Sequence, residues 1–230
     1  MANNSTGGYG CRQAMTVGNT PATGGQSEFV VQGGGSPGAT IAIFKGAPVG
    51  MQTAAGGAGT LGYIQDQTAA AMTDGIVGGN TWAKNTANTN GSLGVFNGAT
   101  FVDANGKPTW TNGLAAAQTS SVDYNTGSND ITAFVNTNPL QEYVARADAA
   151  VVVGSFNTLT NTGFNLSDAG AGVNGQSDCT LDISGVATTG VAHYMWKLVR
   201  SADVEDQKDL TAAGADIVIS YNPQSNAYLA

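Results

Sequence analysis

The sequence predicts an all-β protein, an antiparallel β-sandwich or barrel of jelly-roll type with an extended N-terminal arm and long loops. Short runs of β-branched and aromatic residues alternate with smaller or polar residues, which is the period of a strand. Turn dipeptides and glycine-rich segments separate these runs. Neither a β-α-β spacing nor a fixed-period repeat is visible in the sequence. We therefore expect helix in at most about 15% of the residues.

The size and composition of the chain favour one large domain. It has 230 residues, of which 10% are charged, against about 25% in ordinary soluble domains. Small and polar residues fill the difference, which suits tight turns or a surface hidden in an assembly. We predict an arm over residues 1–26 and a single β domain over residues 27–230.

The first 26 residues are small and polar, with two Gly-Gly pairs and a proline. This composition is typical of an extended arm rather than a packed element. We expect a chain without residues 1–20 to remain folded. The larger side chains of the arm are the candidates for binding a partner protein or another subunit: Tyr9, Cys11, Arg12 and Met15.

The clearest structural signal lies between Gly91 and Gly113. Asn97-Gly98 and Asn105-Gly106 both favour tight turns, because Asn and Gly tolerate positive φ. The runs between and after them are rich in strand-forming residues, so a three-stranded meander is predicted. Pro108 cannot donate a hydrogen bond to a neighbouring strand, so its own strand is expected at a sheet edge.

Two other elements carry predicted core residues. In the strand over residues 191–200, alternation puts Tyr194, Trp196 and Leu198 on one face, which we expect to be buried. The closing strand over residues 215–221 places Ile217 and Ile219 together. A short helix is predicted over residues 65–73 and a long loop region over residues 154–178. The further strands are predicted at residues 28–32, 39–44, 47–52, 60–64, 131–135, 142–145, 149–153 and 179–183.

Charge and hydropathy exclude two classes of partner. The net charge is −8, and the eight basic residues are scattered along the chain, whereas nucleic-acid binding needs clustered cations. An anionic membrane surface is disfavoured for the same reason. The N-terminus has no signal-peptide pattern, and no apolar run approaches the roughly 20 residues of a membrane span. We expect a soluble protein made in the cytoplasm.

The residues give little support for catalysis or for a cofactor. His193 is the only histidine, and no nucleophile motif accompanies it, so we expect it to be structural and the protein not to be an enzyme. Residues 33–38 formally fit a dinucleotide-binding GxGxxG, but a strand pattern follows where a helix is required. No cofactor is expected.

Two further groups of residues have a structural and a functional interpretation. Asp203, Glu205, Asp206 and Asp209 form an acidic cluster, which we interpret as a solvated loop rather than a Ca²⁺ site, because the EF-hand spacing is missing. Cys11 and Cys179 could form a bridge, but two buried free thiols are the favoured interpretation.

Several motifs in chain order resemble head decoration (cement) proteins of tailed bacteriophages of the cyanophage and marine phage type. The motifs are Gly10 with Arg12, Gly46-Ala47-Pro48-Val49, Leu93–Gly98 followed by Asp103 and Gly106–Trp110, Tyr143-Val144 with Asp148, and Ile217–Asn222. Cys11 and Gln13 stand where Leu and Pro are usual around the arginine. The resemblance implies a non-catalytic virion protein that binds the major capsid protein on the capsid surface, commonly as a homotrimer.

An alternative interpretation comes from the tryptophans. Trp82 or Trp110, if exposed, would provide an aromatic face on which a sugar ring stacks. The protein would then be a carbohydrate-binding adhesin or a tail-associated β module. A glycan hydrolase is the least favoured interpretation, because nothing proposes the necessary pair of carboxylates.

Overall fold

The structure is a computed structural model that describes residues 4–5, 7–18, 20–22, 25–31, 42–51, 64–66, 92–115, 131–152, 156, 161–164, 173–187, 196–202 and 207–221. The fold of these residues is all-β with antiparallel sheets, one of them curled into a half-barrel, and no α-helix occurs among them. The predicted fold class is confirmed. The division into an arm and one domain stays a prediction.

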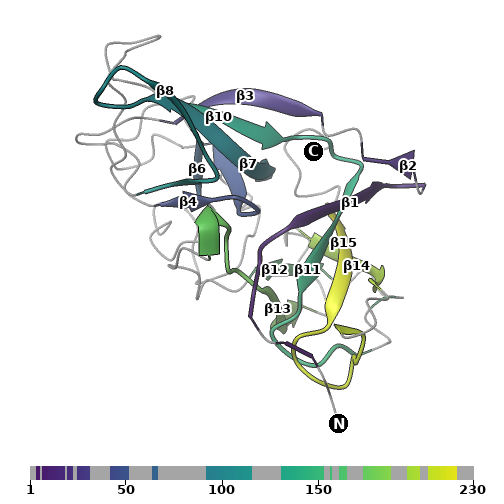
Figure 1. The fold of residues 1–230 in the computed structure, drawn as a ribbon. Helices are drawn as coiled ribbons and strands as arrows, with labels where there is room; N and C mark the ends of the chain where they lie inside the picture. Colours follow the sequence, from purple (N-terminus) through teal and green to yellow (C-terminus); the bar gives the residue numbers. More distant parts are fainter. Residues whose placement is uncertain are drawn as a thin grey trace, which may run out of the picture.

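The lower sheet in Figure 1 has seven strands. In spatial order they are β13 (Leu181–Ala187), β12 (Asn161–Phe164), β14 (Trp196–Ser201), β15 (Asp216–Tyr221), β11 (Gln141–Arg146), β1 (Arg12–Thr16) and β2 (Thr20–Pro21). Its core holds an aromatic cluster, in which Trp196 stacks on Tyr221 with ring centroids 4.5 Å apart and Tyr143 meets both rings edge-on. The predicted burial of Trp196 and Leu198 is confirmed, whereas Tyr194 lies outside the described residues.

The upper sheet in Figure 1 has six strands and a separate core around Phe96, Ile43 and Leu114. It contains β3 (Gln26–Val31), β10 (Ile131–Asn136), β7 (Ser92–Val102), β5 (Pro48–Met51) and β6 (Ile64–Asp66), with β8 (Pro108–Thr111) paired to β7. A third, two-stranded sheet pairs β4 (Ile43–Phe44) with β9 (Gly113–Leu114), and η2 (Val173–Gly175) is a single 3-10 turn.

The N-terminal segment is extended, as predicted, but it is paired rather than free. β1 pairs with β11 through Arg12↔Val144 and Gln13↔Tyr143, inside the seven-stranded sheet. Cys11 N–H donates to Gly46 O over 2.8 Å and Gly10 N–H donates to Cys179 O over 3.1 Å. The composition of the segment did not reveal this pairing, because strands pair through backbone N–H and C=O groups. Every non-proline residue carries both groups, whatever its side chain.

The meander prediction is half right. Asn105-Gly106 forms the turn between β7 and β8, with Gly106 at φ 80°, and β8 is an edge strand among the described residues, as Pro108 predicts. Asn97-Gly98 is not a turn. β7 runs straight through it, and the register against β10 shifts by one residue there, which is a β-bulge.

Trp110 explains why glycine is needed at the bulge. Gly98 has φ 137° and a Cβ there would collide with the indole of Trp110, which also lies 5.1 Å from the ring of Phe134. The indole therefore lies against the backbone of β7, with half of its surface exposed. The bulge uses the same positive-φ tolerance that makes Asn-Gly a turn signal.

We expect Gly98→Ala to lower the free energy of unfolding by about 1–3 kcal/mol. The added methyl group must displace Trp110, and the alanine must adopt a φ that is strained for a residue with a side chain. Urea denaturation measures this change, and the emission of Trp110 should move to longer wavelength as the ring is pushed into water. Gly25→Ala is the control, since nothing lies within 4 Å of a Cβ at that exposed position. Equal stability of the two variants would contradict the packing of Trp110 on Gly98.

The remaining predicted elements have mixed outcomes. The strands at 28–32, 47–52, 131–135, 142–145 and 215–221 are confirmed as β3, β5, β10, β11 and β15. The predicted strand over 149–153 is wrong for residues 149–152, where Val151 is buried and Val152 is 72% exposed. The region predicted as loop over 154–178 contains β12 and η2. Most of the predicted helix over 65–73 lies outside the described residues, although residues 65–66 belong to β6.

Candidate functional site

Two of the four candidate residues, Tyr9 and Arg12, come together in one charged cluster. The guanidinium groups of Arg12 and Arg146 lie 4.0 and 4.7 Å from the centre of the Tyr9 ring. Both arginines also face the carboxylate of Asp216, which is 1% exposed: Arg146 Nε donates to it over 3.0 Å, and Arg12 lies 3.9 Å away. The cluster therefore neutralises a buried carboxylate with two cations that also bind an aromatic ring.

This cluster holds the N-terminal segment to the fold. Arg146 Nη1 donates to the backbone oxygen of Gly7 over 2.7 Å. Burial raises the pKa of the Tyr9 phenol well above its ordinary value, and the carboxylate of Asp216 raises it further, so the ring stays neutral between the two guanidinium groups. Tyr9 thus serves mainly to anchor the segment, whereas the side chain of Arg12 remains 54% exposed.

Cys11 belongs to the core and not to a binding surface. It is 5% exposed, Cys179 is fully buried, and both are free thiols, as the favoured interpretation predicts. Burial raises the pKa of the Cys11 thiol well above its ordinary value, and the neighbouring Cys179 raises it further. The thiolate, which is the reactive form, is therefore disfavoured at this position.

Met15 is exposed, and two further exposed hydrophobic residues lie near it in the fold, which the sequence did not reveal. Three of the five large hydrophobic side chains that are exposed in the described part of the chain are Met15 (43%), Val17 (53%) and Leu140 (54%). Hydrogen bonds place the two segments side by side, since Val17 N–H donates to Leu140 O over 2.8 Å, and Gln141 Nε2 donates to Met15 O over 3.0 Å. We call these three residues the N-terminal apolar patch.

A partly open sheet edge adjoins the patch. β2 pairs with β1 only at Met15↔Pro21 and Thr16↔Thr20, and no described strand pairs with Arg12–Ala14 on that side. In Figure 1, β2 and the end of β1 that pairs with it lie at the right border of the molecule, whereas the start of β1 lies between the two sheets. An edge strand with exposed apolar neighbours is a surface to which another chain can add a strand.

The sequence contains little indication that Val17 and Leu140 belong to a binding surface. Each is a single apolar residue beside polar turn residues, and single surface hydrophobes are normal. Leu140 follows Asn138-Pro139, where Asn136 and Asn138 each accept a backbone N–H through the side-chain oxygen, at 3.1 and 3.0 Å. Only the pairing of β1 with β11 brings the two residues together.

The described residues give no support for a metal site or a catalytic site at the residues that the sequence singled out. Asp209 is engaged in its own turn, where Thr211 N–H and Oγ1–H donate to its carboxylate and lower its pKa. The other three acidic residues of the cluster, as well as His193 and Trp82, lie outside the described residues. No group of three or more His, Cys, Asp or Glu side chains in the described part of the chain is arranged to hold a metal. None of its helices is long and apolar enough to cross a membrane.

Comparison of the chain with protein-family models gives no match, and comparisons with curated proteins and with solved structures give none either. The described surface therefore has to support a function through its own geometry and chemistry.

Proposed function

We propose that the protein is a structural virion protein that binds the major capsid protein on the outer surface of a phage head and stabilises the capsid lattice. The observation that carries this proposal is the N-terminal apolar patch beside the open edge of β1. The sequence motifs that resemble head decoration proteins supply the class of partner. A cement protein acts by adhesion, so it needs a docking surface and no catalytic group.

The chemistry of the surface suits a protein partner. Met15, Val17 and Leu140 provide apolar area at the centre of the contact, and the exposed guanidinium of Arg12 lies at the start of the same strand. Methionine and arginine are enriched in protein interfaces, whose cores are depleted in other charged residues. The backbone edge of Arg12–Ala14 adds hydrogen bonds that set the direction of the added strand.

A homotrimer would strengthen weak docking. Three copies of the patch, held in one symmetric particle, raise the effective concentration of the second and third contacts once the first has formed. We therefore propose that the protein docks as a trimer at positions of local threefold symmetry. Sedimentation of the purified protein measures its oligomeric state, and a monomer at all concentrations would remove this part of the proposal.

The test replaces the patch while keeping the fold. We expect the double variant Met15→Ser and Leu140→Ser to bind undecorated heads about 30-fold or more weakly, the loss that follows from removing about 2 kcal/mol at an interface hot spot. Added protein and heads are sedimented together, and bound copies per head are measured against protein concentration.

Val152→Ser is the matched control, because Val152 is 72% exposed and lies outside the patch. It should bind like wild type. If the patch variant binds heads in the same number of copies as wild type, the patch is not the docking surface. If wild type does not bind heads at all, the capsid function is contradicted.

The second candidate function is that of a carbohydrate-binding adhesin or tail-associated module, and the exposure of Trp110 favours it. The indole is 50% exposed on the outer face of β8, beside Phe134. An exposed aromatic face on a rigid strand suits stacking on a sugar ring. Binding of glycans that is lost in Trp110→Ala, without any binding to heads, would favour this function over the first.

A further inference from the structure

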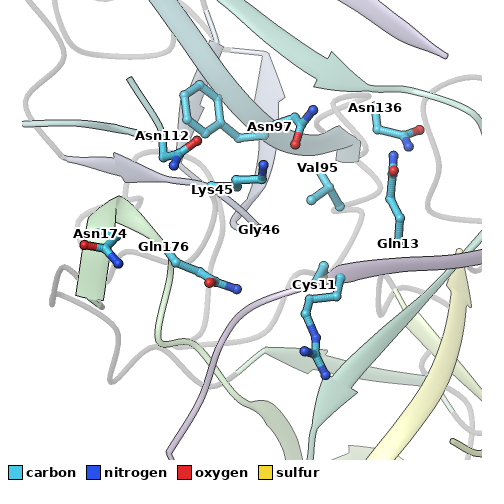
Figure 2. Close-up of a pocket in the computed structure, with 12 residues that line it drawn as sticks. Cys11, Gln13, Lys45, Gly46, Val95, Asn97, Asn112, Asn136, Asn174 and Gln176 are labelled. Atoms are coloured by element: carbon cyan, nitrogen blue, oxygen red, sulfur yellow. The ribbon is translucent and has the colours of Figure 1, made fainter. Parts of the chain in front are cut away.

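A pocket of about 370 Å³ lies where the N-terminal segment meets the upper sheet, and no residue of the N-terminal apolar patch lines it. Figure 2 shows its polar side chains, which come from β1, β7, β10, the chain after β4, the link between β8 and β9, and η2 with the residue after it. Its volume is within the usual range for small-molecule sites. The lining residues are Cys11, Arg12, Gln13, Lys45, Gly46, Val95, Phe96, Asn97, Asn112, Asn136, Asn174 and Gln176.

The lining is unusual in its chemistry. Six of these twelve residues carry a carboxamide, and none carries a carboxylate, although the chain as a whole has 16 acidic residues. A carboxamide both donates and accepts hydrogen bonds, which is also the property of a hydroxyl group. The buried side chains of Val95 and Phe96 provide an apolar part of the wall.

Asn136 is the buried polar group that points to a ligand. It is 1% exposed, and its Oδ1 accepts the N–H of Asn138 over 3.1 Å, which fixes the orientation of the amide. Its Nδ2 has no hydrogen-bond partner among the residues that the structure describes. In Figure 2, Asn136 and the exposed side chain of Gln13 point toward one another at one end of the pocket. A buried amide donor without a partner is rare in folded proteins, since its desolvation is not compensated.

Lys45 supplies one positive charge on a rigid backbone. Its N–H donates to Asn112 O and Gly175 O over 2.8 and 3.0 Å, and its carbonyl accepts Ser177 N–H over 2.8 Å. The described residues contain no carboxylate within ion-pair distance of its ammonium. The guanidinium of Arg12, by contrast, is directed to Tyr9 and Asp216.

We propose that this pocket binds a small acidic saccharide, with its hydroxyl groups on the carboxamides and its carboxylate on the ammonium of Lys45. The Nδ2 group of Asn136 donates to a ligand oxygen once Gln13 turns outward. Hard cations prefer carboxylate oxygens, which the lining lacks, and phosphate sites gather several cations or backbone N–H groups. The pocket shares Arg12 and Gln13 with the strand edge proposed for docking, but its lining contains none of Met15, Val17 and Leu140.

The test titrates isotopically labelled full-length protein with D-glucuronate and, separately, with D-glucose, and follows backbone amide NMR signals. We expect signals of Lys45, Asn112, Asn136 and Gln176 to shift with glucuronate at millimolar concentrations, with about tenfold weaker binding of glucose. Lys45→Gln should remove the preference for glucuronate, and Asn136→Leu should weaken both sugars about tenfold or more.

The control is Lys107→Gln, which removes an exposed lysine at the β7–β8 hairpin and should leave both affinities unchanged. If Asn136→Leu fails to fold, Lys45→Gln still tests the charge. The proposal is overturned if neither sugar shifts the pocket signals at about 50 mM. It is also overturned if the shifts are confined to Trp110 and its neighbours, or if Lys107→Gln has the same effect as Lys45→Gln.

Discussion

Trp196→Ala is expected to lower the free energy of unfolding by about 3–5 kcal/mol. Trp196 is fully buried at the centre of the aromatic cluster, stacked on Tyr221 and met edge-on by Tyr143. Its removal leaves a large cavity and two aromatic rings without their partner. The strands around it, β14, β15 and β11, are held in one sheet, so they have little freedom to close the cavity.

Urea denaturation followed by circular dichroism measures this loss, and Trp110→Ala is the matched control. Trp110 is the same residue type with half of its surface exposed, so its replacement should cost about 1 kcal/mol or less. A Trp196→Ala variant that is as stable as Trp110→Ala would mean that the aromatic cluster does not form the core of the seven-stranded sheet.

Removing residues 1–16 should destabilise the protein by at least about 4 kcal/mol or prevent cooperative folding. The deletion takes away strand β1, the buried Cys11 and the ring of Tyr9 between two guanidinium groups. Asp216 loses Arg12, one of its two cations. This expectation reverses the one from composition, in which a chain without residues 1–20 was expected to remain folded.

The deletion is compared with the double variant Met15→Ser and Val17→Ser in the same denaturation experiment. Both replaced side chains are exposed, so that variant should remain within about 0.5 kcal/mol of wild type. A truncated chain with wild-type stability would show that β1 contributes nothing to the fold. If the truncated chain unfolds, its failure to bind heads carries no information on docking, which is why the docking test replaces side chains instead.

The candidate docking surface was only partly predictable. Met15 was singled out because a large apolar residue is conspicuous in a small, polar segment, and it is exposed in the structure. Cys11 stood out for the same reason, yet it is buried. Sequence composition cannot separate these two outcomes, since both residues lie in one extended segment and burial depends on what the rest of the chain places against it.

Local pattern alone determined the all-β class, the turn at Asn105-Gly106, the edge position of β8 and the burial of Trp196. These features depend on alternation and turn chemistry within a few residues, so the sequence contains them directly. Only the tertiary structure decided that Asn97-Gly98 is a bulge, that the N-terminal segment is a strand of the sheet, and that the amide of Asn136 faces a pocket. Each of these depends on residues far apart in the chain: Trp110 lies over Gly98, β11 pairs with β1, and Gln13 faces Asn136. Such contacts are set by how the sheets pack, which no short window of sequence records.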